Sequence, residues 1–145
     1  MSWGSRTALL VTLALVAVGC GTSESRRDAE ARGNLQPRLT ELIESAESAL
    51  IQHQDAEDVV AQFTHREVLE TIVVGDVVTW TVALTTQAQD PRSWGNSVDI
   101  VGSCVQVRGH AGDGGSLQVV SVECSPMLLR RSSVALDVEI DLLED

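Results

Sequence analysis

The 145-residue sequence predicts an α+β fold: an N-terminal amphipathic helix packed on an antiparallel meander of about five strands. Apolar residues recur at helical spacing in one early stretch of the chain. Later, short β-branched runs alternate with turns that contain glycine or proline. A helix followed by strands with short connections indicates α+β rather than an alternating α/β fold.

The predicted helix follows Asn34. Asn34 or Gln36 can cap it, and Pro37 is tolerated in a first turn, where its missing N–H has no intrahelical partner. The apolar stripe, which we interpret as facing the core, consists of Leu35, Leu39, Leu42, Ile43, Ala46, Ala49 and Leu50. Residues 52–66 fit either a second helical piece or the start of a strand.

The first two strands are predicted on either side of Gly75 and Asp76, a glycine-first dipeptide of the kind that type II′ hairpins prefer. We expect the apolar face of this hairpin to include Leu84, with Thr79, Thr81 and Thr85 on the other face. Counting outward from the turn gives the pairs Val73 with Val78, Thr71 with Trp80 and Leu69 with Val82.

Three further strands are predicted over residues 98–108, 117–124 and 134–142. Gly102 can mark a bulge in the first of them. The last has the clearest alternation, with Asp137, Glu139 and Asp141 on its polar side. Cystatin-like and NTF2-like folds have a comparable layout, an analogy that concerns the fold alone.

Residues 1–19 have the layout of a secretory signal: Arg6, an apolar run over residues 8–18 and the small residue Gly19. The run is shorter than the roughly 20 residues that a membrane-spanning helix needs. Its end, Ala17-Val18-Gly19-Cys20, resembles the lipobox of bacterial lipoproteins. The resemblance implies cleavage before Cys20, acylation of the Cys20 thiol and a lipid-anchored, extracytoplasmic location in the cell envelope. An ordinary signal peptide with an incidental Cys20 is the alternative.

The polar residues 20–34 then form a lipidated N-terminus and flexible tether, and residues 35–145 form a single domain. If Cys20 carries lipid, Cys104 and Cys124 remain as a pair in an oxidising compartment. Placing them opposite each other in a hairpin, with the loop centred on Gly114, brings them within the Cα distance of a disulfide. Two free, buried thiols in a reduced protein are the alternative.

The formal net charge of −11 argues against nucleic acid as a partner, because phosphates would be repelled. We expect no metal and no cofactor. Structural zinc normally has four ligands, and the glycine-rich loop after Gly109 lacks the lysine and the following helix of a P-loop.

His65 and Glu67 share a strand face if this segment is extended, which permits a carboxylate-oriented imidazole, but no nucleophile is recognisable nearby. We therefore predict no catalytic residues and interpret His53 and His65 as surface residues. The acidic row of the last strand is read as a solvent face rather than a cation site. Trp94, His110 and Asp113 are the candidate partner contacts, although burial of Trp94 is the stronger interpretation.

Two functional hypotheses follow. The first is a non-enzymatic, membrane-anchored lipoprotein domain that binds another envelope protein. The alternative is a carrier of a small apolar ligand, which requires a pocket between helix and sheet lined by Leu42, Leu50, Trp80 and their neighbours. A solidly packed interface would instead favour the protein binder.

Overall fold

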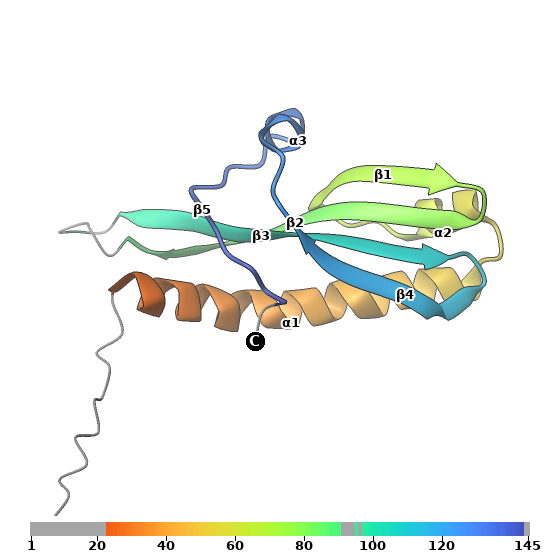
Figure 1. Cartoon of the computed structure of the whole chain (residues 1–145), viewed down its shortest axis with the longest axis horizontal. Helices are drawn as coiled ribbons and strands as arrows, with labels where there is room; N and C mark the ends of the chain where they lie inside the picture. The colour runs from red at the N-terminus through yellow and green to blue at the C-terminus, as the bar shows by residue number, and fades with distance from the viewer. Residues whose placement is uncertain (1–22, 91–94, 96, 144–145) are drawn as a thin grey trace, which may run out of the picture.

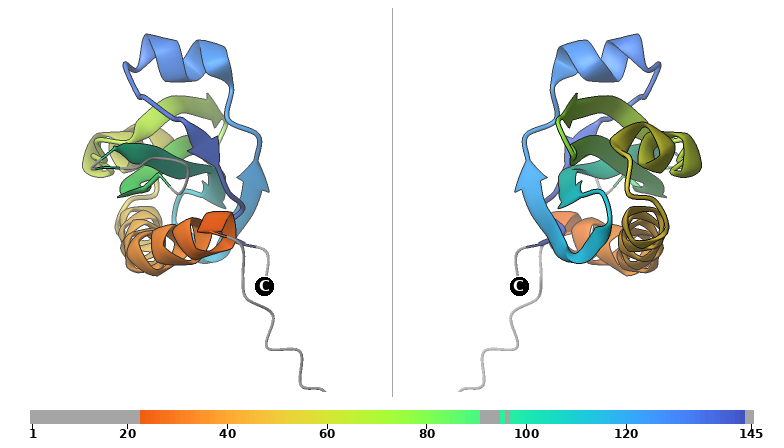
Figure 2. Two further views of the ribbon diagram at one scale, coloured as in Figure 1. Left: turned by 90° about the vertical axis from the view of Figure 1, so that its left-hand side faces the viewer. Right: turned by 90° about the vertical axis from the view of Figure 1, so that its right-hand side faces the viewer.

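The computed structural model describes residues 23–90, 95 and 97–143. Its elements are α1 (Ser23–Gln52), α2 (Ala56–Gln62), β1 (Val68–Val74), β2 (Val77–Gln89), β3 (Val98–His110), β4 (Asp113–Val122), α3 (Pro126–Arg131) and β5 (Val138–Glu139). β1 to β4 form an antiparallel sheet in that spatial order, and β5 pairs with β3 in parallel. α1 lies along one face of the sheet and α3 stands over the other (Figures 1 and 2). This mixture of helix and antiparallel sheet confirms the α+β class.

α1 is 30 residues long and covers the middle of the sheet. It begins at Ser23, so residues 23–34, predicted as part of a flexible tether, are helical instead. The early turns bury apolar surface at Ala31, and Arg27 binds Asp99 of β3 at 2.8 Å. The sheet-facing stripe consists of Ala31, Leu35, Leu39, Leu42, Ala46, Ala49 and Leu50.

Pro37 lies inside α1 rather than in its first turn. An interior proline removes one backbone hydrogen bond and typically costs about 3 kcal/mol. Leu35 and Leu39, on either side of it, are both buried against the sheet. We infer that the packing of these flanking turns offsets the lost hydrogen bond, which is why the helix continues.

The segment 52–66 contains α2, which begins after the N-cap residue Asp55. The Asp55 carboxylate accepts a 2.8 Å hydrogen bond from the Glu57 amide, a standard N-cap interaction. Ala56 and Val59 are buried against the main core, and Phe63 follows as the helix ends. A second helical piece, one of the two predicted alternatives, is therefore present.

The β1–β2 hairpin turns at Gly75 and Asp76, where Gly75 takes a positive φ of 63°. The predicted pairs Val73 with Val78 and Thr71 with Trp80 are confirmed. The third pair is wrong, because a register shift between Val68 and Glu70 places Val68 opposite Val82. The shift turns Leu69 to the other side of the sheet, where it joins a second apolar cluster.

The β3–β4 hairpin has a different register from the predicted one. Cys104 lies opposite Val122 instead of Cys124, and Gln106 lies opposite Val120. Its turn is tighter than predicted, because Ala111 and Gly112 alone separate the two strands. The φ of Gly112 is 82°, a conformation that glycine adopts without strain.

The irregularity of this hairpin falls between Arg108 and His110, not at Gly102. Gly102 lies in the regular β2–β3 ladder opposite Thr85. A Cβ at Gly102 would come within 2.7 Å of both the Leu136 side chain and the Leu84 carbonyl oxygen. The glycine therefore permits close approach of the C-terminal segment instead of marking a bulge.

The predicted strand over residues 134–142 is mostly irregular. Only Val138 and Glu139 form β5, and they pair with β3 in parallel, so the predicted antiparallel fifth strand is wrong. α3 carries the chain over the face opposite α1, and the chain then crosses the β3 edge beyond the last β3–β4 pair. Along this path Leu136 packs on one side of the sheet and Ile140 on the other.

The described residues form two apolar clusters, one on each face of the sheet. The larger joins α1 and α2 to alternate residues of β2 and β3, including Val78, Trp80, Val105 and Val107. The smaller lies under α3 and contains Leu69, Ala83, Cys104 and Cys124, with Val122, Leu128, Leu129, Val134 and Leu136 packed against it.

Candidate functional site

Cys104 and Cys124 form the disulfide that the sequence predicts. The bond is diagonal rather than directly across the ladder: Cys124 lies just beyond the end of β4, with a Cα–Cα distance of 5.2 Å to Cys104. The Cys124 amide donates to the Glu139 carboxylate at 2.9 Å. The bridge therefore holds the end of β4, the approach to α3 and the β5 segment against the centre of the sheet.

Two of the candidate partner contacts, His110 and Asp113, lie at the β3–β4 turn. His110 Nδ1 is 3.2 Å from the Asp76 carboxylate, and this hydrogen bond lowers the pKa of Asp76. The Ala111 amide donates to the Asp76 carbonyl oxygen, and the Gly112 amide donates to the Leu50 carbonyl oxygen. His110 thus helps to join the β3–β4 turn to the β1–β2 turn. The backbone hydrogen bond from Gly112 also ties the β3–β4 turn to the end of α1.

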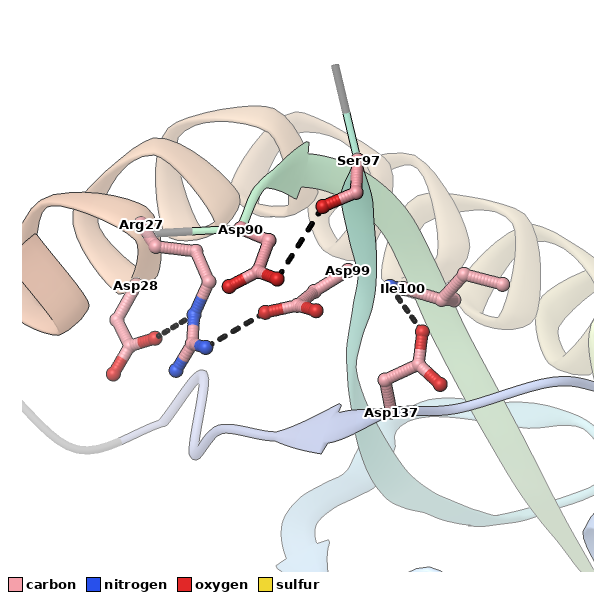
Figure 3. Close-up of polar contacts among 7 residues, drawn as sticks. All are labelled: Arg27, Asp28, Asp90, Ser97, Asp99, Ile100 and Asp137. Carbon is pink, nitrogen blue, oxygen red and sulfur yellow. Dashed lines mark hydrogen bonds and ion pairs between the residues drawn. The ribbon is translucent and has the colours of Figure 1, made fainter. Parts of the chain in front are cut away.

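Trp94 and Cys20 lie outside the described residues. Asp90 and Ser97 stand on either side of Trp94 in the sequence. Both lie at the opposite end of the β2–β3 ladder from His110. There Arg27 of α1 binds both Asp28 and Asp99 (Figure 3). Of the three sequence-predicted contacts, the structure therefore places His110 and Asp113 alone, and it brings these two together at one turn.

The carboxylates of the acidic row in the C-terminal segment accept hydrogen bonds from nearby segments of the same chain. Asp137 accepts from the Ile100 amide at 2.8 Å (Figure 3), and Glu139 accepts from Cys124 as above. Asp141 accepts from Ser121 Oγ and from the Leu143 amide. These carboxylates fasten the segment to the sheet. Among the described residues, no group of three or more His, Cys, Asp or Glu side chains is arranged to hold a metal ion.

His65 and Glu67 meet Arg38 of α1 in a partly buried cluster. Arg38 donates to the Glu67 carboxylate and to the Thr85 carbonyl oxygen, which links α1 to the sheet. His65 Nδ1 lies 3.7 Å from Glu67 Oε2, too far for a hydrogen bond, and both atoms are buried without a partner. The Phe63 ring stacks on His65 with a centroid distance of 6.1 Å.

Burial lowers the pKa of His65, the positive charge of Arg38 lowers it further, and Glu41 opposes the shift. The imidazole is therefore neutral near pH 7. An imidazole beside a carboxylate could accept a proton, but catalysis needs a reacting group within hydrogen-bond reach. Within the described residues, no hydroxyl or thiol is hydrogen-bonded to His65 Nδ1.

An open groove of about 500 Å³ adjoins this cluster at the outer margin of β1. It is lined by Phe63, Thr64, His65, Arg66, Val68 and Thr71. The lining includes β1 but no residue of β2, the other strand of that hairpin. The groove therefore opens beside the edge of the sheet.

The carrier hypothesis requires a pocket lined by Leu42, Leu50 and Trp80. All three side chains are almost fully buried and belong to the same core cluster. Three hollows on the described surface lie elsewhere: beside β1, beside the β4–β5 junction and beside residues 85–87 of β2. None of these is lined by Leu42, Leu50 or Trp80.

The face of the sheet opposite α1, here called the outer face, is uncovered beyond α3. Cross-strand partners share a face of a sheet, and Trp80 faces α1, so the alternate residues point outward. The exposed apolar side chains on this face include Ile72, exposed by 44%, Val74, exposed by 70%, and Val120, exposed by 49%. We call the outward-facing group formed by Ile72, Val74, Val77, Thr79, Gln106, Arg108, Gln118 and Val120 the outer patch.

Sequence reasoning missed the outer patch, because the run from Ile72 to Val74 is apolar on both faces and shows no alternation. The uncovered end of the sheet follows from the place where α3 packs, which the local pattern does not reveal.

Comparison with protein-family models, curated proteins and solved structures finds no match. Within the part of the chain that the structure describes, no helix has both the length and the hydrophobicity of a membrane span.

Proposed function

We propose that this chain is a non-enzymatic, lipid-anchored, extracytoplasmic domain that binds another protein of the cell envelope through the outer patch. The observation that carries the proposal is the exposure of Ile72, Val74 and Val120 on one uncovered sheet face. Ile72 and Val74 lie together on β1, and polar residues of β2 and β3 separate them from Val120 on β4. Exposed apolar groups that share a face with polar residues are typical of protein-binding surfaces.

The patch is held by regular backbone pairing. Ile72, Thr79, Arg108 and Gln118 form one row across β1 to β4. A surface built on a paired sheet loses little conformational entropy when a partner docks, which favours binding. Arg108 adds a positive charge to a strongly acidic chain, so a partner can gain polar as well as apolar contacts.

The proposed anchor fits this arrangement. Only Gly21 and Thr22 separate Cys20 from the start of α1 at Ser23. α1 lies on the opposite side of the sheet from the outer patch (Figure 2). A lipid on Cys20 would therefore attach the chain through its helix side and leave the outer patch available to a neighbouring protein.

The anchor and the binding surface can be tested separately. A Cys20→Ala variant should move from the membrane to the soluble extracytoplasmic fraction, and its retention in the membrane would contradict lipid anchoring. For binding, a photo-crosslinking amino acid at Val120 should give one discrete adduct with an envelope protein in intact cells. The same probe at Ile51, an exposed residue on the α1 side, is the matched control.

A second substitution makes the binding test specific. Val74→Lys places a charge within the patch and should abolish the Val120 adduct without changing the amount of folded protein. Absence of an adduct at Val120, or the same adduct from Ile51, would overturn the proposed binding surface.

The carrier alternative would have to use a surface hollow such as the groove beside β1, since Leu42, Leu50 and Trp80 fill the helix–sheet interface. The groove is open, whereas binding sites for small apolar ligands usually enclose most of the ligand surface. The outer patch therefore supports the protein-binding function better.

A further inference from the structure

β1 is an edge strand without the usual protection against pairing. It pairs only with β2, so its other edge is free of strand partners in the described structure. Proteins normally protect such edges with charged residues, proline or covering elements. From Thr71 to Val74 the strand contains neither a charge nor proline, and its last three residues, Ile72, Val73 and Val74, are each more than two-fifths exposed.

We propose that two copies of this chain pair through their β1 strands, antiparallel, about a two-fold axis at Ile72. The partner of this edge is therefore a second copy of the chain. The resulting sheet continues from β4 of one copy to β4 of the other. This inference does not depend on the lipid anchor or on the outer patch.

Charge separates the register centred on Ile72 from the adjacent one centred on Val73. Centring the pair on Ile72 places Glu70 opposite Val74 of the second copy, so no two acids face each other. Centring it one residue later, on Val73, would place Glu70 opposite Asp76 of the second copy. Like charges directly opposite each other are destabilising, which favours the axis at Ile72.

The same register brings an exposed side chain to the groove. Thr71 lies opposite Val73 of the second copy, and both side chains point to the α1 side because Thr71 pairs with Trp80 and Val73 with Val78. Thr71 lines the groove beside β1, together with Phe63 and Val68. The 43% exposed Val73 of each copy therefore enters the groove of the other. Such mutual insertion is what an interface with two-fold symmetry requires.

The arrangement also suits two chains on one surface. A two-fold axis perpendicular to the sheet keeps both α1 helices on the same face of the continuous sheet. Both outer patches then face the opposite way and become neighbours, since Ile72 and Val74 belong to the patch and lie on the strand at the axis. Pairing would thus double the outer surface.

Ile72→Cys tests the proposal, because a residue on the axis faces its own copy. Directly opposed residues in an antiparallel pair have Cα atoms about 4.5–5.5 Å apart, within disulfide range. The full chain is oxidised in intact cells and separated on a non-reducing gel, with the unsubstituted chain as the background for other cysteines. Val120→Cys is the matched control, since it is similarly exposed on the other edge strand, β4.

We expect a strong, reductant-sensitive dimer band from Ile72→Cys and several-fold less from Val120→Cys. Adding Val73→Lys to Ile72→Cys should remove the band, because each lysine would place a charge against the groove of the other copy. Light scattering should report a dimer for the purified, unsubstituted chain and a monomer for Val73→Lys.

Equal crosslinking of Ile72→Cys and Val120→Cys, or a band that survives Val73→Lys, would overturn the proposed interface. So would a monomeric unsubstituted chain at the concentrations of the experiment. Circular dichroism of Val73→Lys verifies that a lost band does not reflect unfolding.

Discussion

The two faces of the sheet are stabilised in different ways. The α1 face is closed by one continuous helix, and its core residues alternate regularly along β2 and β3. The outer face is closed only in part, by the short helix α3, the irregular C-terminal segment and the Cys104–Cys124 bridge. Its remaining half exposes Ile72, Val74 and Val120. The comparison shows that one face of the sheet is closed by a continuous helix while the other is only partly covered.

The largest effect is expected on the α1 face. Leu42 is fully buried, and Leu42→Ala should lower the free energy of unfolding by about 2–5 kcal/mol, because it removes apolar contacts and leaves a cavity. Val74→Ala, on the exposed half of the outer face, should change it by less than about 0.5 kcal/mol. Urea titration of both variants measures the contrast. Similar losses would mean that the outer patch is part of the core.

The disulfide should dominate the stability of the outer face. The bridge joins residues 20 positions apart, and a loop of this length is worth about 3 kcal/mol in the unfolded state. Replacing both partners with alanine should therefore reduce the free energy of unfolding by about that amount. Cys20→Ala should leave it unchanged. An unaltered denaturation midpoint in the double variant would show that the smaller apolar cluster under α3 is stable without the disulfide.

Gly102 tests how closely the C-terminal segment approaches the sheet, and Gly33 in α1 is the control. Gly102→Ala should destabilise the protein by about 1–3 kcal/mol, since the new Cβ meets Leu136 and the Leu84 carbonyl oxygen. Gly33→Ala, in α1, meets nothing within 4 Å and should stabilise by about 0.5–1 kcal/mol through helix propensity. Thermal unfolding of the two variants measures the expected loss of stability in Gly102→Ala and the expected gain in Gly33→Ala. A tolerated Gly102→Ala would mean that the segment can move away from β3.

The smallest effect concerns pH. Because the pKa of His65 is lowered in the folded protein, the unfolded chain binds a proton at a higher pH than the folded chain does. The contribution of His65 to stability is thus fully present above its ordinary pKa of about 6.5 and is lost as the pH falls through the lower folded value.

His65→Gln should therefore weaken the loss of stability as the pH falls from about one unit above to about one unit below the ordinary histidine pKa of about 6.5, measured as the shift of the urea midpoint. Thr64→Ala, a substitution beside His65 that removes no titratable group, is the control and should preserve the full dependence. Identical pH profiles for the two variants would show that burial of His65 does not contribute.

Local patterns predicted the parts of the fold in which neighbouring residues decide the structure. The glycine-first turn at Gly75 set the pairs Val73 with Val78 and Thr71 with Trp80, because two strands that leave a two-residue turn have little freedom of register. The stripe from Leu35 to Leu50 identified the helix face that packs on the sheet. The cysteine pair also follows from the sequence, although its diagonal geometry does not.

Local sequence patterns were insufficient where contacts between distant segments decide the structure. The polar composition of residues 23–34 indicated a tether, yet Ala31 is buried and Arg27 binds Asp99, so tertiary contacts make this stretch helical. The alternation over residues 134–142 indicated one strand. Its apolar residues instead divide between the two sides of the sheet, because the chain must pass the β3 edge on its way from α3 to the α1 side.

The sequence by itself determined the α+β class, the first hairpin, the core stripe of α1 and the pairing of Cys104 with Cys124, since short-range geometry and side-chain chemistry suffice for each. Only the tertiary structure decided the length of α1, the register of β3 with β4, the course of the C-terminal segment and the half of the outer face that stays uncovered. Each of these depends on packing between residues far apart in the chain, which local periodicity does not encode.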